Sequence, residues 1–195
     1  MTDAPSKIRL KIADFMQLFS DDGPFELIDG EKIPLAPQAP ISGDINFLLA
    51  RLLADFVEEY ELGRIFVEVP FVMTDPDDSN WVTGSRVPDA MFYAQSRIDE
   101  LAKSDPEWRL KPIPMPPDLA VEVISPSDRF SAVSKKIDGY LSDGVRLVWV
   151  VDPGPEEVIV YKPGIHPARL GKDDALSGDS IVANFSISVA RLFKT

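Results

Sequence analysis

The stretch PDLAVEVISP at residues 117–126 is the most informative part of this chain. It is an apolar, β-branched run bounded by prolines, which predicts a buried strand. One carboxylate, that of Glu122, lies in the middle of the run. A buried carboxylate is costly unless it is paired with a cation, protonated or bound to a metal. Glu122 is therefore the first candidate functional residue.

Composition predicts one globular domain over residues 1–195. Apolar residues make up 45% of the chain and charged residues 27%, as is usual for such a domain. No run approaches the ~20 apolar residues of a transmembrane helix, and the N-terminus lacks a basic segment followed by an apolar one. With no cysteine in the chain, these features favour a cytoplasmic protein that does not enter a membrane.

The residue inventory excludes several kinds of chemistry. The absence of cysteine excludes disulfides, thiolate zinc sites and cysteine nucleophiles. The single histidine, His166, argues against serine-type triads and histidine metal clusters, and its Pro/Gly-rich surroundings predict a surface loop residue. The net charge of −12 argues against holding nucleic acid mainly through a basic surface.

The hydrophobic pattern predicts an α+β chain with one long early helix. The longest periodic segment is 42–60, which Gly63 follows closely. Asp29-Gly30 predicts a type I′ hairpin turn within residues 25–35. Further helices are expected at 10–20, 96–103, 129–142 and 188–193, and strands at 64–72, 90–93, 119–124, 145–151 and 158–162. Residues 75–84 are expected to form a polar loop.

Three predicted strand elements each carry a carboxylate on an otherwise apolar pattern. Alternation places Glu122 on the strand face opposite Val121 and Val123, and Asp89 opens the strand at 90–93. A two-residue turn places Glu26 across the hairpin from Ile33. Carboxylates that converge on rigid strands suit Mg²⁺, which prefers oxygen ligands. The alternative is that each carboxylate pairs with a buried arginine or caps a turn.

A lysine on the next predicted helix adds a positive charge. At 100° per residue, Val133, Ile137 and Leu141 share the buried face of the helix at 129–142. Lys136 lies at the edge of that face, from which it can reach Glu122, whereas Lys135 points toward solvent. An ordinary exposed pair of lysines is the alternative.

Several motifs, in order along nearly the whole chain, resemble one family. They are ELIDGE at 26–31, VPD at 87–89, DLAVEVISPSDR at 118–129, Lys136-x-x-x-Tyr140 and WVVDP at 149–153. The chain resembles the Uma-two-type putative restriction endonucleases of the PD-(D/E)XK nuclease superfamily. This resemblance implies a restriction-endonuclease-like core of the α+β or α/β class, in which helices flank a central mixed β-sheet. The N-terminal hairpin and long helix accompany that core.

The resemblance also implies the site residues. Asp89 and Glu122 match the metal-binding carboxylates, which would hold Mg²⁺ or Mn²⁺, and Glu26 matches an early acidic position. Ile124 stands where the superfamily usually has its catalytic lysine, and the family pattern instead offers Lys136 on the following helix. The family often has a histidine just before the long helix, and residues 39–42 contain none.

The implied activity is metal-dependent hydrolysis of DNA phosphodiester bonds by an endonuclease, with a homodimer as a convenient arrangement for cutting two strands. A local patch is expected to bind DNA, formed from a few basic side chains: Arg86, Arg97, Arg109, Lys111 and Arg129. The alternative is a nuclease-fold module without cleavage activity that binds or regulates. The acidic charge and the missing histidine favour this alternative.

Overall fold

The computed structural model describes residues 10–125, 128 and 130–194. The described residues group into two compact units. The first takes those within Met1–Pro37, Val69–Val87 and Ala102–Pro116. The second takes those within Gln38–Glu68, Pro88–Leu101 and Pro117–Thr195. Within the described residues, no helix is long and apolar enough to cross a membrane.

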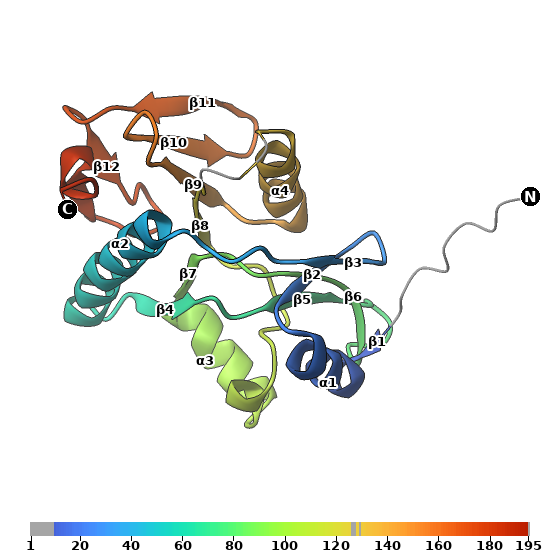
Figure 1. Ribbon diagram of the computed structural model, residues 1–195. Coiled ribbons are helices and arrows are strands. Elements are labelled where there is room, and N and C mark those ends of the chain that lie inside the picture. Colours follow the sequence, from blue (N-terminus) through green and yellow to red (C-terminus); the bar gives the residue numbers. More distant parts are fainter. Residues whose placement is uncertain (1–9, 126–127, 129, 195) are drawn as a thin grey trace, which may run out of the picture. The chain divides into compact units, whose positions relative to one another are not determined.

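A five-stranded sheet and one helix form the first unit (Figure 1). The strands are β1 (Leu10–Lys11), β6 (Trp81–Arg86), β2 (Phe25–Ile28) and β3 (Glu31–Pro34) in that order, with β5 (Phe71–Thr74) also paired to β6. Helix α1 (Ile12–Asp22) contributes Phe15 to a core with Phe25, Leu27, Val72 and Val82. A short 3₁₀ helix, η1 (Trp108–Leu110), completes the described elements of this unit.

The hairpin of β2 and β3 confirms the predicted turn and register. Asp29 and Gly30 both have positive φ, 53° and 81°, as a type I′ turn requires. Ile28 pairs with Glu31, and Glu26 pairs with Ile33. Glycine adopts such a φ without strain and aspartate tolerates it, so this dipeptide sets the register of both strands.

The second unit contains a mixed six-stranded sheet. The strand order is β11 (Ile165–Leu170), β10 (Glu157–Lys162), β9 (Leu147–Asp152), β8 (Leu119–Val123), β7 (Ala90–Ala94) and β4 (Gly63–Val67). Only the β8–β9 pair is parallel, and the other pairs are antiparallel. The expected central mixed sheet is thus confirmed, with the strand that carries Glu122 inside it.

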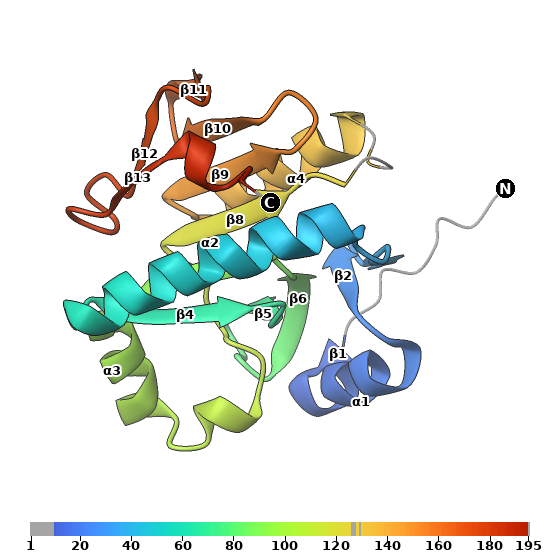
Figure 2. The same ribbon diagram turned by 60° about the vertical axis from the view of Figure 1, so that its left-hand side comes forward.

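Helices flank this sheet. Helix α2 (Pro40–Glu59) runs across β8 (Figure 2), and Pro40 opens it at a position where the missing N–H of proline costs nothing. Helix α4 (Phe130–Asp143) connects β8 to β9, and α3 (Gln95–Ser104) follows β7 directly. The C-terminal part of the unit contains a small hairpin, β12 (Ala175–Ser177) and β13 (Ser186–Ser188), and the 3₁₀ helix η2 (Val189–Arg191). The short helix predicted at 188–193 is this 3₁₀ turn.

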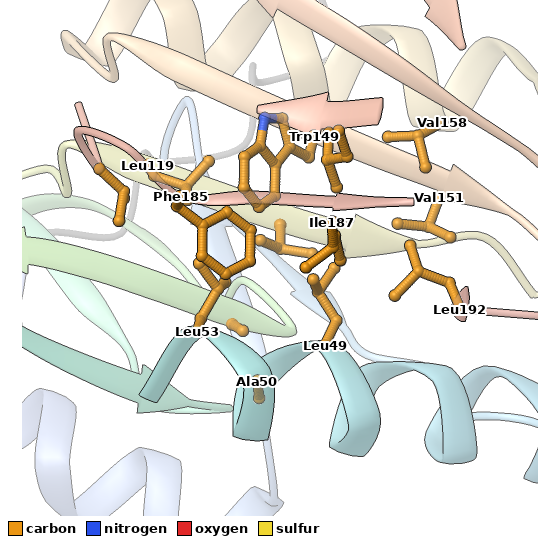
Figure 3. Close-up of a cluster of buried hydrophobic side chains, with 14 of the residues drawn as sticks. Leu49, Ala50, Leu53, Leu119, Trp149, Val151, Val158, Phe185, Ile187 and Leu192 are labelled. Carbon is orange, nitrogen blue, oxygen red and sulfur yellow. The ribbon is translucent and has the colours of Figure 1, made fainter. Parts of the chain in front are cut away.

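The largest core lies between α2 and one face of the six-stranded sheet. Figure 3 shows Leu49, Ala50 and Leu53 of α2 beneath Trp149, with Phe185 and Ile187 from the C-terminal part beside them. Trp149 and Leu49 are fully buried. Because alternate residues of a strand point to opposite faces, Val121 and Val123 enter this core while Glu122 points to the other face.

The structure corrects two sequence predictions in the region 64–84. The single strand predicted at 64–72 is wrong, because β4 ends at Val67 and β5 begins at Phe71 in the other sheet. Glu68 takes a positive φ of 54° and Pro70 follows, which ends the extended run. The loop predicted at 75–84 is also wrong, because most of β6 lies within it. Gly84 in this strand packs closely, since a Cβ added there would lie 2.7 Å from Met73 Cε.

A third correction concerns His166. The Pro/Gly-rich segment around it was expected to be a loop, but only its start is a turn, at Pro163 and Gly164. His166 belongs to β11, at one edge of the six-stranded sheet, and is exposed as predicted.

Candidate active site

Strands β7 and β8 bring Asp89 and Glu122 to the same end of the six-stranded sheet. Their antiparallel register pairs Ala90 with Val121 and Met91 with Ala120. One further step in this register places Asp89 opposite Glu122, and residues directly opposite in an antiparallel pair share a face. The backbone N–H of Val123 donates a hydrogen bond to Asp89 Oδ2 at 2.6 Å, which ties the start of β7 to the end of β8.

Helix α4 supplies two donors to Glu122. Lys136 Nζ donates to Glu122 Oε2 at 2.8 Å, and the hydroxyl of Tyr140 donates to Oε1. The two donors are four residues apart and therefore lie on one stripe of the helix. Lys135, the neighbouring lysine, is exposed. The predicted approach of Lys136 to Glu122 is thus confirmed.

The beginning of α2 supplies polar contacts to Asp89 and to the end of β8. Gln38 Nε2 donates to Asp89 Oδ1, and Asn46 Nδ2 donates to the Asp89 carbonyl oxygen at 3.2 Å. Ser42 Oγ donates to the carbonyl oxygen of Ile124 at 3.1 Å. Ser42 and Asn46 are both buried and are one helical turn apart. The start of α2 is therefore joined by hydrogen bonds to both carboxylate-bearing strands.

Burial has the largest effect on the electrostatics of Asp89. It raises the pKa of Asp89, and the nearby carboxylates of Glu68 and Asp128 also raise it, whereas the Val123 N–H and the charge of Lys136 lower it. Asn46 Oδ1, an acceptor beside Asp89, is buried and has no hydrogen-bond partner among the described residues. Oxygen acceptors of Asp89 and Asn46 thus lie close together at this end of the sheet.

The donor chemistry fits Mg²⁺ or Mn²⁺. In the described part of the chain, no group of three or more acidic, histidine or cysteine side chains is arranged to hold a metal ion. Mg²⁺ does not need such a group, because it is commonly held by one or two carboxylates and keeps several waters. Asp89 and Glu122 provide two carboxylates on adjacent strands, within the number that Mg²⁺ commonly takes from a protein.

Glu26 lies in the first unit, on β2, and is only 3% exposed. Its Oε1 accepts a hydrogen bond from the backbone N–H of Val87 at 3.1 Å. This contact holds the chain just before the Pro88-Asp89 dipeptide. Glu26 thus anchors the backbone at Val87, a role that the sequence did not predict.

Most of the basic residues expected to form a DNA-binding patch are engaged elsewhere. Arg97 Nη1 lies 3.1 Å from Asp118 Oδ1, and Lys111 Nζ donates to Asp105 at 2.8 Å. Arg86 is only 7% exposed, and the guanidinium of Arg109 lies over the ring of Trp108. Arg129 lies outside the described residues. The structure therefore gives less support than the sequence to a DNA-binding patch formed by these residues.

Sequence reasoning missed Gln38 and gave no role to Tyr140. Gln38 stands in the segment Pro37-Gln38-Ala39-Pro40, where no periodicity marks a functional side chain. Tyr140 had a usable signal, because it follows Lys136 at helical spacing on the stripe that faces Glu122.

Comparison with known proteins agrees with this architecture. The model of the Uma2 family, described as putative restriction endonuclease, matches residues 12–190. The chain therefore belongs to this family. No protein of curated function matches the sequence.

Two solved structures are similar to the chain to different degrees. One is the crystal structure of a putative nuclease belonging to DUF820 from Anabaena variabilis, with 23% sequence identity and a TM-score of 0.75. The match covers 94% of this chain and 97% of that one, which shows a common fold. The other is a DrdV–DNA complex, with 16% identity, a TM-score of 0.34 and coverage of 63% and 66%. This second likeness is too low to carry an argument.

Proposed function

We propose that this protein is a metal-dependent endonuclease that hydrolyses phosphodiester bonds of DNA. The observation that carries the proposal is the placement of Asp89 and Glu122 at one end of two adjacent strands, with Lys136 of α4 bound to Glu122, in a chain that belongs to a nuclease family. The family membership supports nuclease chemistry in general. The metal, the substrate and the residue roles are our inference from the site.

Asp89 and Glu122 would hold the metal, which is Mg²⁺ or Mn²⁺ in this proposal. When bound, such an ion activates water and neutralises charge on a phosphate. Lys136 extends from α4 toward the same carboxylates, and its ammonium group would stabilise the negative charge that develops on the phosphate. Lys136 would thereby supply the positive charge that Ile124, at the superfamily's usual lysine position, cannot supply.

Glu26 would act as a positioning residue in this scheme. Its buried carboxylate holds the Val87 N–H, two residues before the proposed metal ligand Asp89. Removal of that carboxylate would release the segment that leads into β7. We therefore expect Glu26 variants to affect the site through its geometry.

Specific observations also favour a second function, that of a nuclease-fold module without cleavage activity. The chain has a net charge of −12, and several of its expected DNA-contacting cations are paired or buried. A nuclease-fold module that binds or regulates without cleaving would tolerate both features. Such a module would also tolerate the absence of a histidine before α2.

Cleavage of supercoiled plasmid at low salt, with Mg²⁺ and with Mn²⁺, tests the proposal. Wild type is expected to nick or linearise the plasmid, and both Asp89→Ala and Lys136→Ala are expected to lose that activity. Lys135→Ala is the matched control, because it removes the same charge one residue away, on the exposed side of α4.

Three outcomes are informative. Loss in both site variants, with the control active, supports the metal site and the role of Lys136. Loss in Asp89→Ala alone would retain the metal site and remove Lys136 from the chemistry. A folded wild type that cleaves neither plasmid nor other nucleic acids would favour the binding module.

A further inference from the structure

The two carboxylates of the proposed metal site share a pattern of hydrogen bonding. One oxygen of each accepts from a donor that the fold holds in place. Asp89 Oδ2 accepts from the backbone N–H of Val123, and Glu122 Oε1 accepts from the hydroxyl of Tyr140. The other oxygen of each accepts from the end of a long side chain, Gln38 for Asp89 Oδ1 and Lys136 for Glu122 Oε2.

The two kinds of donor differ in their freedom to move. Val123 belongs to β8 in the interior of the sheet, and the Tyr140 side chain is fully buried. Neither donor can leave without disturbing the core. Gln38 is exposed in the segment before α2, and the side chain of Lys136 is 22% exposed on the outer edge of α4. Both long side chains can change rotamer at little cost because water can solvate them when they leave.

The charges indicate what would replace the mobile donors. Gln38 contributes only a neutral amide to Asp89, whereas Lys136 contributes a positive charge to Glu122. A divalent cation is a hard acceptor of carboxylate oxygens and would neutralise both groups together.

We propose that Gln38 and Lys136 compete with a divalent cation for Oδ1 of Asp89 and Oε2 of Glu122, so that binding of the cation displaces both side chains. Val123 and Tyr140 keep the opposite oxygens fixed throughout, so the carboxylates retain their orientation during the exchange. Tyr140 is thus a positioning residue for the metal ligand Glu122. This inference rests on the proposed metal-dependent function and extends it to the order of events at the site.

In this exchange, the ammonium group of Lys136 has a second position, away from Glu122. Its ammonium group now lies against Glu122, at 6.0 Å from the centre of the Tyr140 ring. Once released from Glu122, the same group is available to a phosphate oxygen. The contact with Glu122 would therefore hold the cationic side chain internally, and a cation that takes Glu122 Oε2 would release it for substrate.

Isothermal titration of the full-length chain with Mn²⁺ tests the exchange without measuring activity. Gln38→Ala removes a neutral donor that competes with the ion for Asp89 Oδ1. The Kd for Mn²⁺ is therefore expected to fall about two- to tenfold, which corresponds to the net free energy of one hydrogen bond. Tyr140→Phe removes a fixed donor that orients Glu122, so the Kd is expected to rise about tenfold to a hundredfold. The two variants thus have opposite expected signs.

The chain offers matched controls for both variants. Gln95→Ala removes another glutamine amide that donates to an aspartate, Asp99, away from the site. Tyr161→Phe removes a hydroxyl from the half-buried tyrosine on β10. Neither control should change the Kd. Asp89→Asn should abolish binding, which places the measured ion at this site.

A second measurement covers the case in which a variant fails to fold. In ¹⁵N-labelled wild type, the side-chain amide signal of Gln38, assigned by its loss in Gln38→Ala or by through-bond experiments, should move when Mg²⁺ is added. The signal of Gln95 should stay where it is. An unmoved Gln38 amide at saturating Mg²⁺ would overturn the exchange.

The results separate this inference from the proposed function. Mn²⁺ binding with the same Kd in wild type, Gln38→Ala and Tyr140→Phe would overturn the exchange, and plasmid cleavage would still decide whether the protein is a nuclease. Weaker binding by Gln38→Ala would also overturn it, because Gln38 would then be a supporting group. Failure of wild type to bind Mn²⁺ would overturn both the exchange and the metal-dependent function.

Discussion

Two acidic residues near opposite ends of strand β8 have different surroundings. Asp118, just before the strand, is 1% exposed, and its Oδ1 lies within about 3 Å of both Arg97 and Arg146. Its Oδ2 accepts from the Ala94 N–H at 2.9 Å. Four residues later, Glu122 shares the positive charge of Lys136 with Asp89, the carboxylate on the adjacent strand.

The different surroundings separate a structural carboxylate from a candidate ligand. Two guanidinium groups lie beside Asp118 Oδ1, so the charge of Asp118 is compensated within the protein. At the other end, Asp89 and Glu122 lie on adjacent strands, where burial raises the pKa of Asp89 and Lys136 donates to Glu122. Burial alone therefore does not single out a candidate ligand; the partners of each carboxylate also matter.

Removal of a proposed ligand should have the largest effect. Glu122→Gln keeps an acceptor oxygen for the Tyr140 hydroxyl but loses the charge that holds the metal, so plasmid cleavage should fall by about 10³-fold or more, roughly 4 kcal/mol of barrier. Glu157→Gln is the control, because Glu157 is also a strand carboxylate paired with a cation, Arg169. Wild-type rates in Glu122→Gln would break the distinction between the two ends of β8.

The reverse pattern is expected for Asp118→Asn. Arg97 and Arg146 would lose their counter-charge, so the free energy of unfolding should fall by about 2–3 kcal/mol. Urea denaturation measures this loss. Asp105→Asn removes a half-buried partner of Lys111 and should change the unfolding curve little. An Asp118→Asn protein as stable as wild type would show that this carboxylate is no structural anchor.

The pH dependence of stability sharpens the comparison at Asp89. Because burial raises its pKa in the folded state, the folded protein holds the proton more tightly than the unfolded chain does. The stability from this group is therefore present below the unfolded pKa and is lost as the pH rises through the folded pKa. The side chain of Asp89→Asn does not titrate, so this variant does not lose that stability. The free energy of unfolding of the variant minus that of wild type should therefore rise from about pH 4 to about pH 7. Urea titrations with a chelator present measure this difference. A difference that stays constant or shrinks over this range would contradict the raised pKa.

The smallest effect is expected from Arg146→Met. The Arg146 side chain is 57% exposed, and Arg97 and the Ala94 N–H would continue to hold Asp118. The free energy of unfolding should fall by about 1 kcal/mol or less. A loss as large as that of Asp118→Asn would mean that Arg97 alone does not compensate the buried charge.

Local rules predicted much of the fold and part of the site. The Asp29-Gly30 turn was predictable because it requires two positive φ angles, which few dipeptides tolerate. The approach of Lys136 to Glu122 followed from helical geometry and strand alternation. The role of each residue in catalysis stays a prediction.

Other features depend on distant contacts and leave little trace in the sequence. β4 and β5 were predicted as one strand because their apolar residues are nearly continuous, and the positive φ of Glu68 followed by Pro70 separates them into different sheets. β6 was not predicted because its sequence is polar. Its Ser85 is nevertheless buried, where Oγ accepts a hydrogen bond from the Leu27 N–H at 2.8 Å. The two arginines of Asp118 come from α3 and from the residue before β9, so its charge balance was not visible in the local sequence.

The position of a bound metal ion distinguishes the two ends of β8 without any assay of activity. Crystals soaked in Mn²⁺ should show an anomalous difference peak within coordination distance of both Asp89 and Glu122, and no peak at Asp118. A peak at Asp118, or no density between Asp89 and Glu122 at saturating Mn²⁺, would contradict the assignment of Asp89 and Glu122 as the metal site.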